Sequence, residues 1–234
     1  MTNPTNPPRT LRVGILIFEG FEPIDVWGFV EAFSIARFLG QDYDEGPPYP
    51  FESVLIGRHA GKVKSINGPT AWADLDFDQA LKTPFDVLTI PGGGGTWPLL
   101  NEKADPKGVA QLLDWVCAMD KKVPLMSSVC TGAAVLARAG LLDGRPAATN
   151  HGAFGWVSRH GPKVLWDSVS RWVDAGKYVT SAGVSAGTDL GFYLVSRLAG
   201  RAVAEAAALA AEYDWHRDPQ EPIYFPAPPN MDTK

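Results

Sequence analysis

Short apolar runs that alternate with amphipathic stretches are the feature that most limits how this chain can fold. The clearest runs are Arg12–Phe18 (RVGILIF), Phe85–Ile90 (FDVLTI) and Val123–Val129. Runs of this length without regular polar alternation are typical of strands buried on both faces of a parallel sheet. Such a sheet needs covering helices, so we predict an α/β protein with a doubly wound, mostly parallel sheet and helices on both faces.

The remaining elements are expected to continue this alternation. Helical periodicity favours helices over Asp25–Leu39, Gly108–Met119, Gly132–Ala139, Gly187–Leu198 and Arg201–Tyr213. Further strands are predicted over Phe51–Ile56 and Arg145–Thr149, and Ser170–Val173 with Tyr178–Ser181 is predicted to form a hairpin around an Asp-Ala-Gly-Lys turn.

The length of 234 residues, with 45% hydrophobic residues, fits one large globular domain. We expect this domain to span residues 11–215. Residues 1–10, rich in Asn, Thr and Pro, are predicted to be a disordered leader, and residues 216–234 a Pro-rich tail.

Net charge and cysteine content limit which binding partners and which cellular compartment are expected. With 21 basic and 26 acidic side chains the net charge is -5, which disfavours nucleic acid as a partner. No apolar run approaches the roughly 20 residues of a membrane helix, so no membrane partner is expected. Two cysteines and no signal peptide favour a reducing cytoplasm, and no spacing of His, Cys or Asp suggests a metal.

Cys130 is the strongest candidate for chemistry because it sits where a buried strand turns into a helix (Ser127-Ser128-Val129-Cys130-Thr131-Gly132). A tight turn of this kind exposes a side chain above the sheet. The positive end of the helix dipole is expected to favour the thiolate, which is the nucleophilic form. Cys117 lies inside a predicted helix and is interpreted as a small buried apolar residue.

A glycine run closes another buried strand (Thr89-Ile90-Pro91-Gly92-Gly93-Gly94-Gly95-Thr96). The run matches neither a Walker motif nor a dinucleotide fingerprint. Its backbone N–H groups, with Gly93 and Gly94 as candidates, could stabilise developing negative charge. The alternative is an ordinary flexible loop.

An acidic residue follows the first strand, in Gly20-Phe21-Glu22-Pro23-Ile24-Asp25. Asp25 has two interpretations: it caps the following helix, or it points a carboxyl group at Cys130 as a proton donor and acceptor. Glu19 and Glu22 are competing candidates for the second role.

Of the histidines, His151 is predicted to lie at the same edge of the sheet, because it follows a predicted strand and precedes a helix. It could form a nucleophilic pair with Cys130 or contact the substrate. His59, His160 and His216 are interpreted as surface residues.

Together these motifs resemble the ThiJ/PfpI branch of the class I glutamine-amidotransferase-like superfamily. The resemblance rests on Ile-Pro-Gly-Gly, on Ser-Val-Cys-Thr-Gly and on the segment from Ala139 to His151 (AGLLDGRPAATNH), and it covers roughly residues 11–213. Within that branch, Ile24-Asp25-Val26-Trp27-Gly28 and the threonine after Cys130 are most similar to the isocyanide hydratases.

The resemblance implies a flavodoxin-like fold, a homodimer, a small-molecule substrate, and neither cofactor nor metal. It also implies a reaction in which the Cys130 thiolate attacks an isocyanide to give a thioimidate, which water converts to an N-substituted formamide. Asp25 would move the proton, Thr131 would hydrogen-bond near the sulfur, and N–H groups of Gly93 and Thr131 would assist.

Two departures from other branches of the family narrow the function. Proteolytic relatives carry histidine after the nucleophile, where this chain has Thr131, and regulators add a helix-turn-helix pair, which we do not expect in a chain that closes on a Pro-rich tail. Two alternatives to the hydratase stay open: a deglycase or glyoxalase-like enzyme acting on reactive carbonyls, and a non-catalytic redox or stress sensor in which Cys130 is oxidised.

Overall fold

A computed structural model describes residues 9–223. These residues form an α/β fold around a six-stranded sheet with strand order β2-β1-β5-β6-β10-β9. Most of the predicted leader and the end of the predicted tail lie outside the described residues. The strands of this sheet are β1 (Leu11–Leu16), β2 (Phe51–Ile56), β5 (Val87–Ile90), β6 (Leu125–Ser128), β9 (Trp172–Ala175) and β10 (Tyr178–Ser181).

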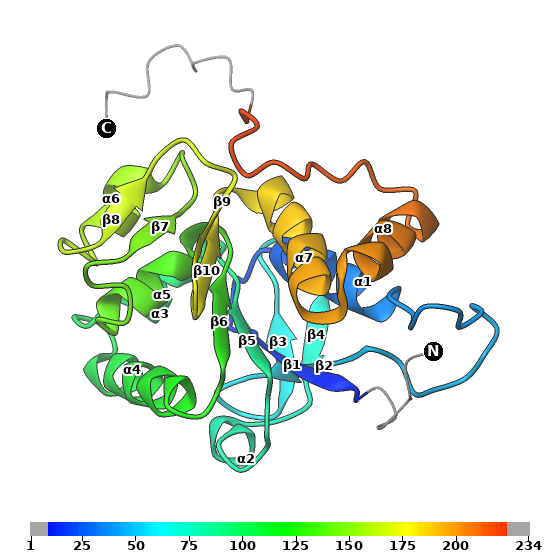
Figure 1. Cartoon of the computed structure of the whole chain (residues 1–234). Helices are drawn as coiled ribbons and strands as arrows, with labels where there is room; N and C mark the ends of the chain where they lie inside the picture. The colour runs from blue at the N-terminus through cyan, green and yellow to red at the C-terminus, as the bar shows by residue number, and fades with distance from the viewer. Residues whose placement is uncertain (1–8, 224–234) are drawn as a thin grey trace.

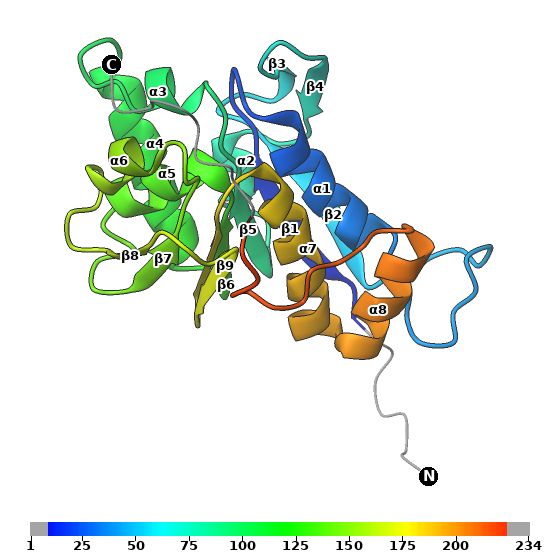
Figure 2. The same cartoon turned by 90° about the horizontal axis from the view of Figure 1, so that it is seen from above.

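Helices cover both faces of the sheet, as Figure 2 shows, with α1, α7 and α8 on one side and α4 and α5 on the other. These helices are α1 (Pro23–Ser34), α4 (Pro106–Asp120), α5 (Ala133–Arg138), α7 (Val184–Ala199) and α8 (Arg201–Ala210). Shorter helices are α2 (Phe77–Ala80), α3 (Thr96–Leu99) and α6 (Phe154–Ser158). The predicted doubly wound architecture is therefore confirmed.

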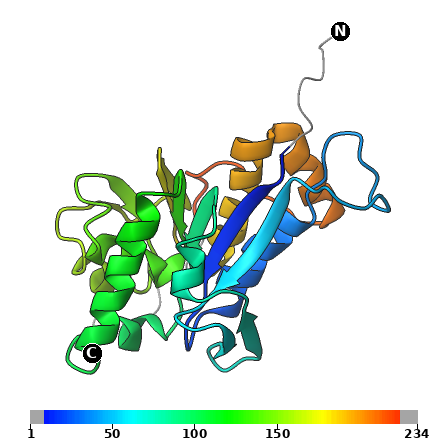
Figure 3. The ribbon, with the colours of Figure 1, turned by 90° about the horizontal axis from the view of Figure 1, so that it is seen from below.

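Every pair in the large sheet is parallel except β9 with β10, which form the predicted antiparallel hairpin. Figure 3 shows β1 and β2 side by side, with the loop of residues 35–50 projecting away from them. All residues of β5, β6 and β10 are buried. This burial explains why their sequences lack polar alternation, because both faces of these strands contact helices or neighbouring loops.

Strand order reverses between β1 and β5, since β2 lies on one side of β1 and the later parallel strands lie on the other. At such a reversal the loops that leave the carboxyl ends of neighbouring strands diverge, and they leave room for a ligand. The segments that follow β1, β5 and β6 therefore meet at one edge of the sheet (Figure 1).

Several elements differ from the sequence prediction. The predicted helix from Asp25 to Leu39 begins at Pro23 and ends at Ser34, because proline is favoured at the first helical position and the chain leaves the helix before the exposed Leu39. The predicted strand Arg145–Thr149 exists as β7 (Pro146–Ala148), but it pairs with β8 (Leu165–Asp167) outside the main sheet. Sequence reasoning missed the hairpin of β3 (Gly61–Lys64) and β4 (Thr70–Ala73), because its alternation spans only four residues a strand.

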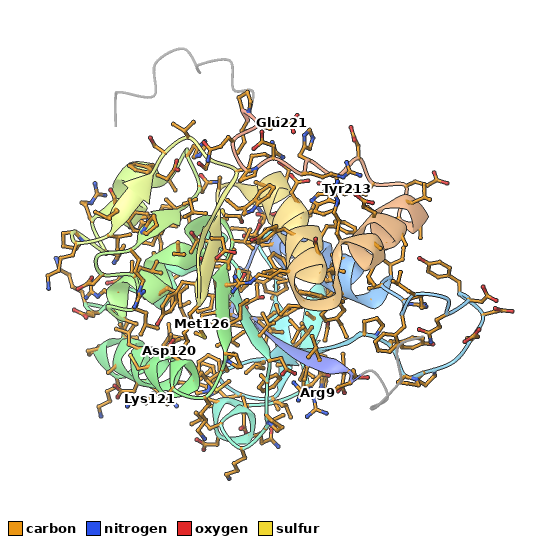
Figure 4. The ribbon with its side chains drawn as sticks, in the orientation of Figure 1. Arg9, Asp120, Lys121, Met126, Tyr213 and Glu221 are labelled. Atoms are coloured by element: carbon orange, nitrogen blue, oxygen red, sulfur yellow. The ribbon has the colours of Figure 1, made fainter. Side chains whose placement is uncertain are left out.

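A buried ion pair fastens the segment after α8 to the domain. Asp189 in α7 is fully buried, and its Oδ2 accepts a hydrogen bond from Arg171 Nε at 3.1 Å. Its Oδ1 accepts hydrogen bonds from the Tyr213 hydroxyl at 3.0 Å and the His216 backbone N–H at 3.1 Å. Figure 4 labels Tyr213 and Glu221, between which the chain runs along the end of α7. The described part of the predicted tail is thus packed against the fold.

No helix within residues 9–223 combines the length and the apolar composition needed to cross a membrane.

Replacing Asp189 with Asn is expected to lower the free energy of unfolding by about 3–5 kcal/mol, because Arg171 would keep its charge in a buried position without its partner. Urea denaturation of the two proteins measures this difference. The matched control is Glu205→Gln, which removes an exposed pair with Arg201 and should change the free energy by less than about 0.5 kcal/mol. Equal losses in the two variants would contradict the importance of burial.

Candidate active site

The nucleophile candidate Cys130 occupies a strained turn at the carboxyl end of β6. Its φ angle is 56°, in the left-handed region that residues with a side chain seldom adopt. The Cys130 N–H donates to the Ala182 carbonyl at 2.8 Å, and the Thr149 hydroxyl donates to the Cys130 carbonyl at 2.8 Å. A single 3-10 turn over Cys130–Gly132 then leads into α5. The predicted elbow is therefore held by hydrogen bonds on both sides of the cysteine.

Glycine is required where the chain after β5 passes this elbow. A Cβ atom on Gly92 would lie 2.6 Å from the Thr131 nitrogen and 2.9 Å from the Cys130 Cβ atom. A Cβ atom on Gly132 would lie 2.2 Å from the Ile90 carbonyl oxygen. Any side chain at these two positions would push the glycine run and the elbow apart, so the two glycines fix how closely the segments approach.

Asp25 reaches this site from the first turn of α1. The side chain is fully buried, and Oδ2 accepts a hydrogen bond from the Gly92 N–H at 2.8 Å. Oδ1 is buried without a hydrogen-bond partner of normal geometry among the described residues. The interpretation of Asp25 as the helix cap is wrong, because Glu22 occupies the N-cap position. A carboxylate this deep inside the protein needs a nearby proton source or positive charge.

The carboxyl group of Asp25 and the thiol of Cys130 influence each other's titration. Burial raises the pKa of Asp25 to about 7, the Gly92 N–H opposes this, the charge of Glu22 adds to it, and the Cys130 thiol opposes it. Burial also raises the pKa of Cys130 to about 12, with a further increase from the Asp25 charge. The largest cause is the same for both groups, since burial disfavours the charged form of each.

The expectation that Cys130 would be a thiolate is therefore contradicted, because the pKa of Cys130 is raised overall. The Thr131 N–H, the Thr131 hydroxyl and the Asn150 side chain each lower the pKa of Cys130, but burial outweighs them. Cys130 is only 6% exposed, and the helix after its 3-10 turn has just six residues. The cysteine is thus a thiol that needs an adjacent base to become a nucleophile.

Threonine hydroxyls extend the site beyond the reacting pair. Thr131 Oγ1 accepts a hydrogen bond from the Gly93 N–H at 3.0 Å and lies 2.9 Å from Thr96 Oγ1. The Gly93 N–H is therefore engaged inside the protein, whereas Gly94 is exposed beside it. Thr96 follows the glycine run directly, and sequence reasoning did not predict it as a site residue.

His151 lies near the site but faces another group. Its pKa is lowered by burial, while Asp167 and the Ser170 backbone raise it. The residue that contacts the sulfur is the preceding one, Asn150. Asn150 and His151 are neighbours in the segment Thr149-Asn150-His151, and the sequence pattern alone does not indicate which of the two reaches Cys130. A role for His151 in binding substrate stays a prediction.

The two competing acidic residues, Glu19 and Glu22, do not contact Cys130 in the hydrogen bonds of the described residues. The Glu19 carboxylate accepts a hydrogen bond from the Lys64 N–H at 3.2 Å and so holds the β3–β4 hairpin, and Glu22 acts on Asp25 only through its charge. Cys117 lies in α4, away from the strand ends. Within residues 9–223, His, Cys, Asp and Glu side chains form no group of three or more that could hold a metal ion.

Sequence comparison identifies relatives of known activity. The chain is 28% identical over 204 residues to an isonitrile hydratase of Pseudomonas putida, with 87% of this chain and 78% of the relative covered. It is 28% identical over 140 residues to the deglycase TK1284 of Thermococcus kodakarensis, with 58% of this chain and 69% of the relative covered.

The fold is shared with solved structures, and a family model matches most of the chain. A ThiJ/PfpI family protein from Pseudomonas syringae superposes with a TM-score of 0.70 at 24% identity, with 88% of this chain and 76% of that chain covered. The model of the DJ-1/PfpI family matches residues 11–197, a range that includes the Asp25 and Cys130 segments and the glycine run between them. The chain belongs to the DJ-1/PfpI family.

Proposed function

We propose that this protein is a cysteine-dependent hydratase that adds water to an isocyanide to form an N-substituted formamide. The single observation that supports this activity most strongly is the buried pair of Asp25 and Cys130 at one edge of the sheet. The Gly92 N–H donates a hydrogen bond to Asp25 there. The similarity to an isonitrile hydratase over 87% of the chain supports the same substrate class.

The reaction begins with one proton shared between the two groups. Asp25 as carboxylate accepts the proton of the Cys130 thiol, and the sulfur attacks the terminal carbon of R–N≡C. The new carbon–sulfur bond leaves an electron pair on that carbon, which takes the proton back from Asp25. The product of this half is the thioimidate R–N=CH–S–Cys130, and Asp25 is again a carboxylate.

Water completes the reaction in the second half. The water oxygen adds to the thioimidate carbon while Asp25 accepts a proton from that water. Asp25 then returns the proton to the substrate nitrogen. The carbon–sulfur bond then breaks, the hydroxyl proton passes to the sulfur through Asp25, and R–NH–CHO is released. One carboxyl group serves every proton transfer, which fits the absence of a hydrogen-bond partner at Asp25 Oδ1 among the described residues.

The Thr131 N–H and the Asn150 side chain act on the sulfur. Both lower the pKa of Cys130, so both stabilise negative charge on the sulfur during attack and departure. Gly94, the exposed residue within the glycine run, is the remaining candidate to contact the substrate from that loop.

The alternatives differ in what they require of Cys130. A redox sensor needs an accessible cysteine with a lowered pKa, whereas Cys130 is 6% exposed and its pKa is raised. A deglycase or glyoxalase-like reaction could use the same thiol and carboxylate to attack a carbonyl carbon, and the similarity to a deglycase favours keeping it as the second candidate.

Purified protein mixed with cyclohexyl isocyanide is expected to form the formamide, and Cys130→Ala should reduce the rate by at least about a thousandfold, because the covalent route is lost. Formamide absorbance follows the reaction. The matched control is Cys117→Ser, which alters the other free cysteine and should keep the native rate. Turnover that survives Cys130→Ala would contradict the proposal, and turnover of methylglyoxal alone would favour the carbonyl reaction.

The pH profile is expected to report the carboxyl group. Because the pKa of Asp25 is raised to about 7, kcat/KM should rise with pH below about 7, as the doubly protonated pair loses a proton, and then stay level to at least pH 9. Asp25→Asn should lose this rise and reduce the rate by about 10² to 10⁴-fold. Steady-state kinetics from pH 5 to 9 measure both effects.

Glu22→Gln provides the control for this profile. The charge of Glu22 raises the pKa of Asp25, so its removal should move the rise to lower pH without changing the plateau rate. A profile that falls through pH 7 in the native protein would contradict the assignment of Asp25 as the initial base.

A further inference from the structure

A buried pair of hydroxyl groups lies next to the sulfur of Cys130. Thr131 follows the cysteine directly, and its Oγ1 lies 2.9 Å from Oγ1 of Thr96, the first residue of α3. Thr96 is fully buried, and Thr131 is 3% exposed. The proposed reaction assigns no step to Thr96, so the contact between these two hydroxyls is not explained by the proton transfers of Asp25.

The hydrogen bonds of Thr131 limit where its own proton can point. A hydroxyl group donates one hydrogen bond and accepts two. Thr131 Oγ1 uses one lone pair to accept the Gly93 N–H, at 3.0 Å. The contact with Thr96 then takes either the second lone pair of Thr131 or its proton. The direction of this one hydrogen bond therefore decides whether the Thr131 proton is available to another acceptor.

The burial of Thr96 sets that direction. Within residues 9–223, the Thr96 hydroxyl has Thr131 Oγ1 as its one hydrogen-bond partner. If Thr131 donated, the proton of Thr96 would be buried without an acceptor, which is costly. If Thr96 donates, its proton is satisfied and Thr131 keeps its own proton for a different acceptor. The second arrangement is more stable because it leaves no buried O–H unpaired.

Two acceptors compete for the Thr131 proton. The Gly93 carbonyl oxygen lies 3.4 Å from Thr131 Oγ1 and already accepts the Thr96 backbone N–H at 3.0 Å. The other acceptor is the Cys130 sulfur, and the hydrogen bond from the Thr131 hydroxyl lowers the pKa of Cys130. Hydrogen bonds to charged groups are stronger than those to neutral ones. The sulfur thus becomes the preferred acceptor as it takes up negative charge.

The position of Thr96 does not depend on its hydroxyl group. Its backbone N–H is held by the Gly93 carbonyl, and the next residue, Trp97, stacks on Trp156 of α6 with ring centroids 4.2 Å apart. These contacts fix the start of α3 beside the elbow. Removal of the Thr96 hydroxyl should therefore leave the backbone in place and alter only the hydrogen bond to Thr131.

We propose that Thr96 is a positioning residue for the nucleophile: its hydroxyl donates to Thr131 Oγ1 and thereby directs the Thr131 proton at the Cys130 sulfur. Thr96 acts on the sulfur only through Thr131. Because negative charge on the sulfur is larger in the transition state than in the thiol, this hydrogen bond lowers the barrier and does not improve substrate binding. Its effect on turnover rests on the proposed function, whereas the direction of the hydrogen bond does not.

Three substitutions in the full chain separate the hydroxyl of Thr96 from its shape. Thr96→Val and Thr96→Ala remove the hydroxyl, with and without a change in size, and Thr96→Ser keeps it. With cyclohexyl isocyanide, the Val and Ala variants should lower kcat about tenfold and keep KM within about twofold, whereas Thr96→Ser should stay within about threefold of the native kcat. The matched control is Thr89→Val, which removes a buried hydroxyl that has no partner among residues 9–223 and should keep the native kcat.

Alkylation of Cys130 by iodoacetamide tests the same hydrogen bond without an isocyanide. Cys117→Ser serves as the background, so that Cys130 is the one cysteine left. The second-order rate constant at pH 9 reports how readily the sulfur becomes negative. Thr96→Val and Thr96→Ala should lower this constant about tenfold, and Thr96→Ser and Thr89→Val should leave it near the native value.

The two assays distinguish the failure of this inference from the failure of the proposed function. Native alkylation rates in both variants without the hydroxyl would overturn the inference, even where isocyanide turnover stands. Equal losses in Thr96→Ser and Thr96→Ala would also overturn it, because the methyl group would then matter and not the hydroxyl. Slower alkylation of these variants, in a protein that does not hydrate isocyanides, would support the inference and contradict the proposed function.

Discussion

Close backbone packing at the carboxyl ends of β1, β5 and β6 sets the distance between Asp25 and Cys130. The Gly92 N–H donates to Asp25 on one side, and on the other side Gly92 leaves no room for a Cβ atom between itself and Cys130. A third contact, from the Cys130 N–H to the Ala182 carbonyl, ties the elbow to β10. Asp25, Gly92 and Cys130 come from different parts of the chain. The sheet order and the covering helices bring these three segments together.

The low polarity of this junction determines its chemistry. In water, the carboxyl group of Asp25 would lose its proton readily and the thiol of Cys130 would be partly ionised near its ordinary pKa. Inside the protein both pKa values are raised, since burial penalises each negative charge and the first charge disfavours the second. The pair consequently holds one proton over a wide pH range. In the proposed reaction that proton moves between oxygen and sulfur, so that two side chains supply an acid, a base and a nucleophile.

Much of this arrangement could be predicted from the sequence. The predicted strands Phe51–Ile56 and Tyr178–Ser181 match observed strands with the same bounds, because residues with a high preference for strands form a strong local signal. The alternation of strands and helices then places the ends of neighbouring parallel strands together. Asp25, Cys130 and the glycine run each follow a predicted strand, and this position together with the family resemblance predicts them as site residues.

The rest depends on contacts that local patterns do not encode. Whether burial or the helix dipole controls Cys130 is decided by how deeply the elbow is covered, which requires all the packed elements. Thr96 and Asn150 reach the site through side-chain directions that follow from the fold. His151 has the residue type expected at an active site, yet the backbone of the turn after β7 brings its neighbour to the sulfur instead.

The pKa of Asp25 is the quantity that tests this account most directly. Nuclear magnetic resonance of protein labelled with [¹³C]aspartate can follow the side-chain carboxyl carbon of Asp25 from pH 3 to 9, with Asp25→Asn to assign the signal. The account predicts a midpoint near 7. A midpoint near 4, the ordinary value for an aspartate, would contradict it, because burial would then not control the titration of the carboxyl group.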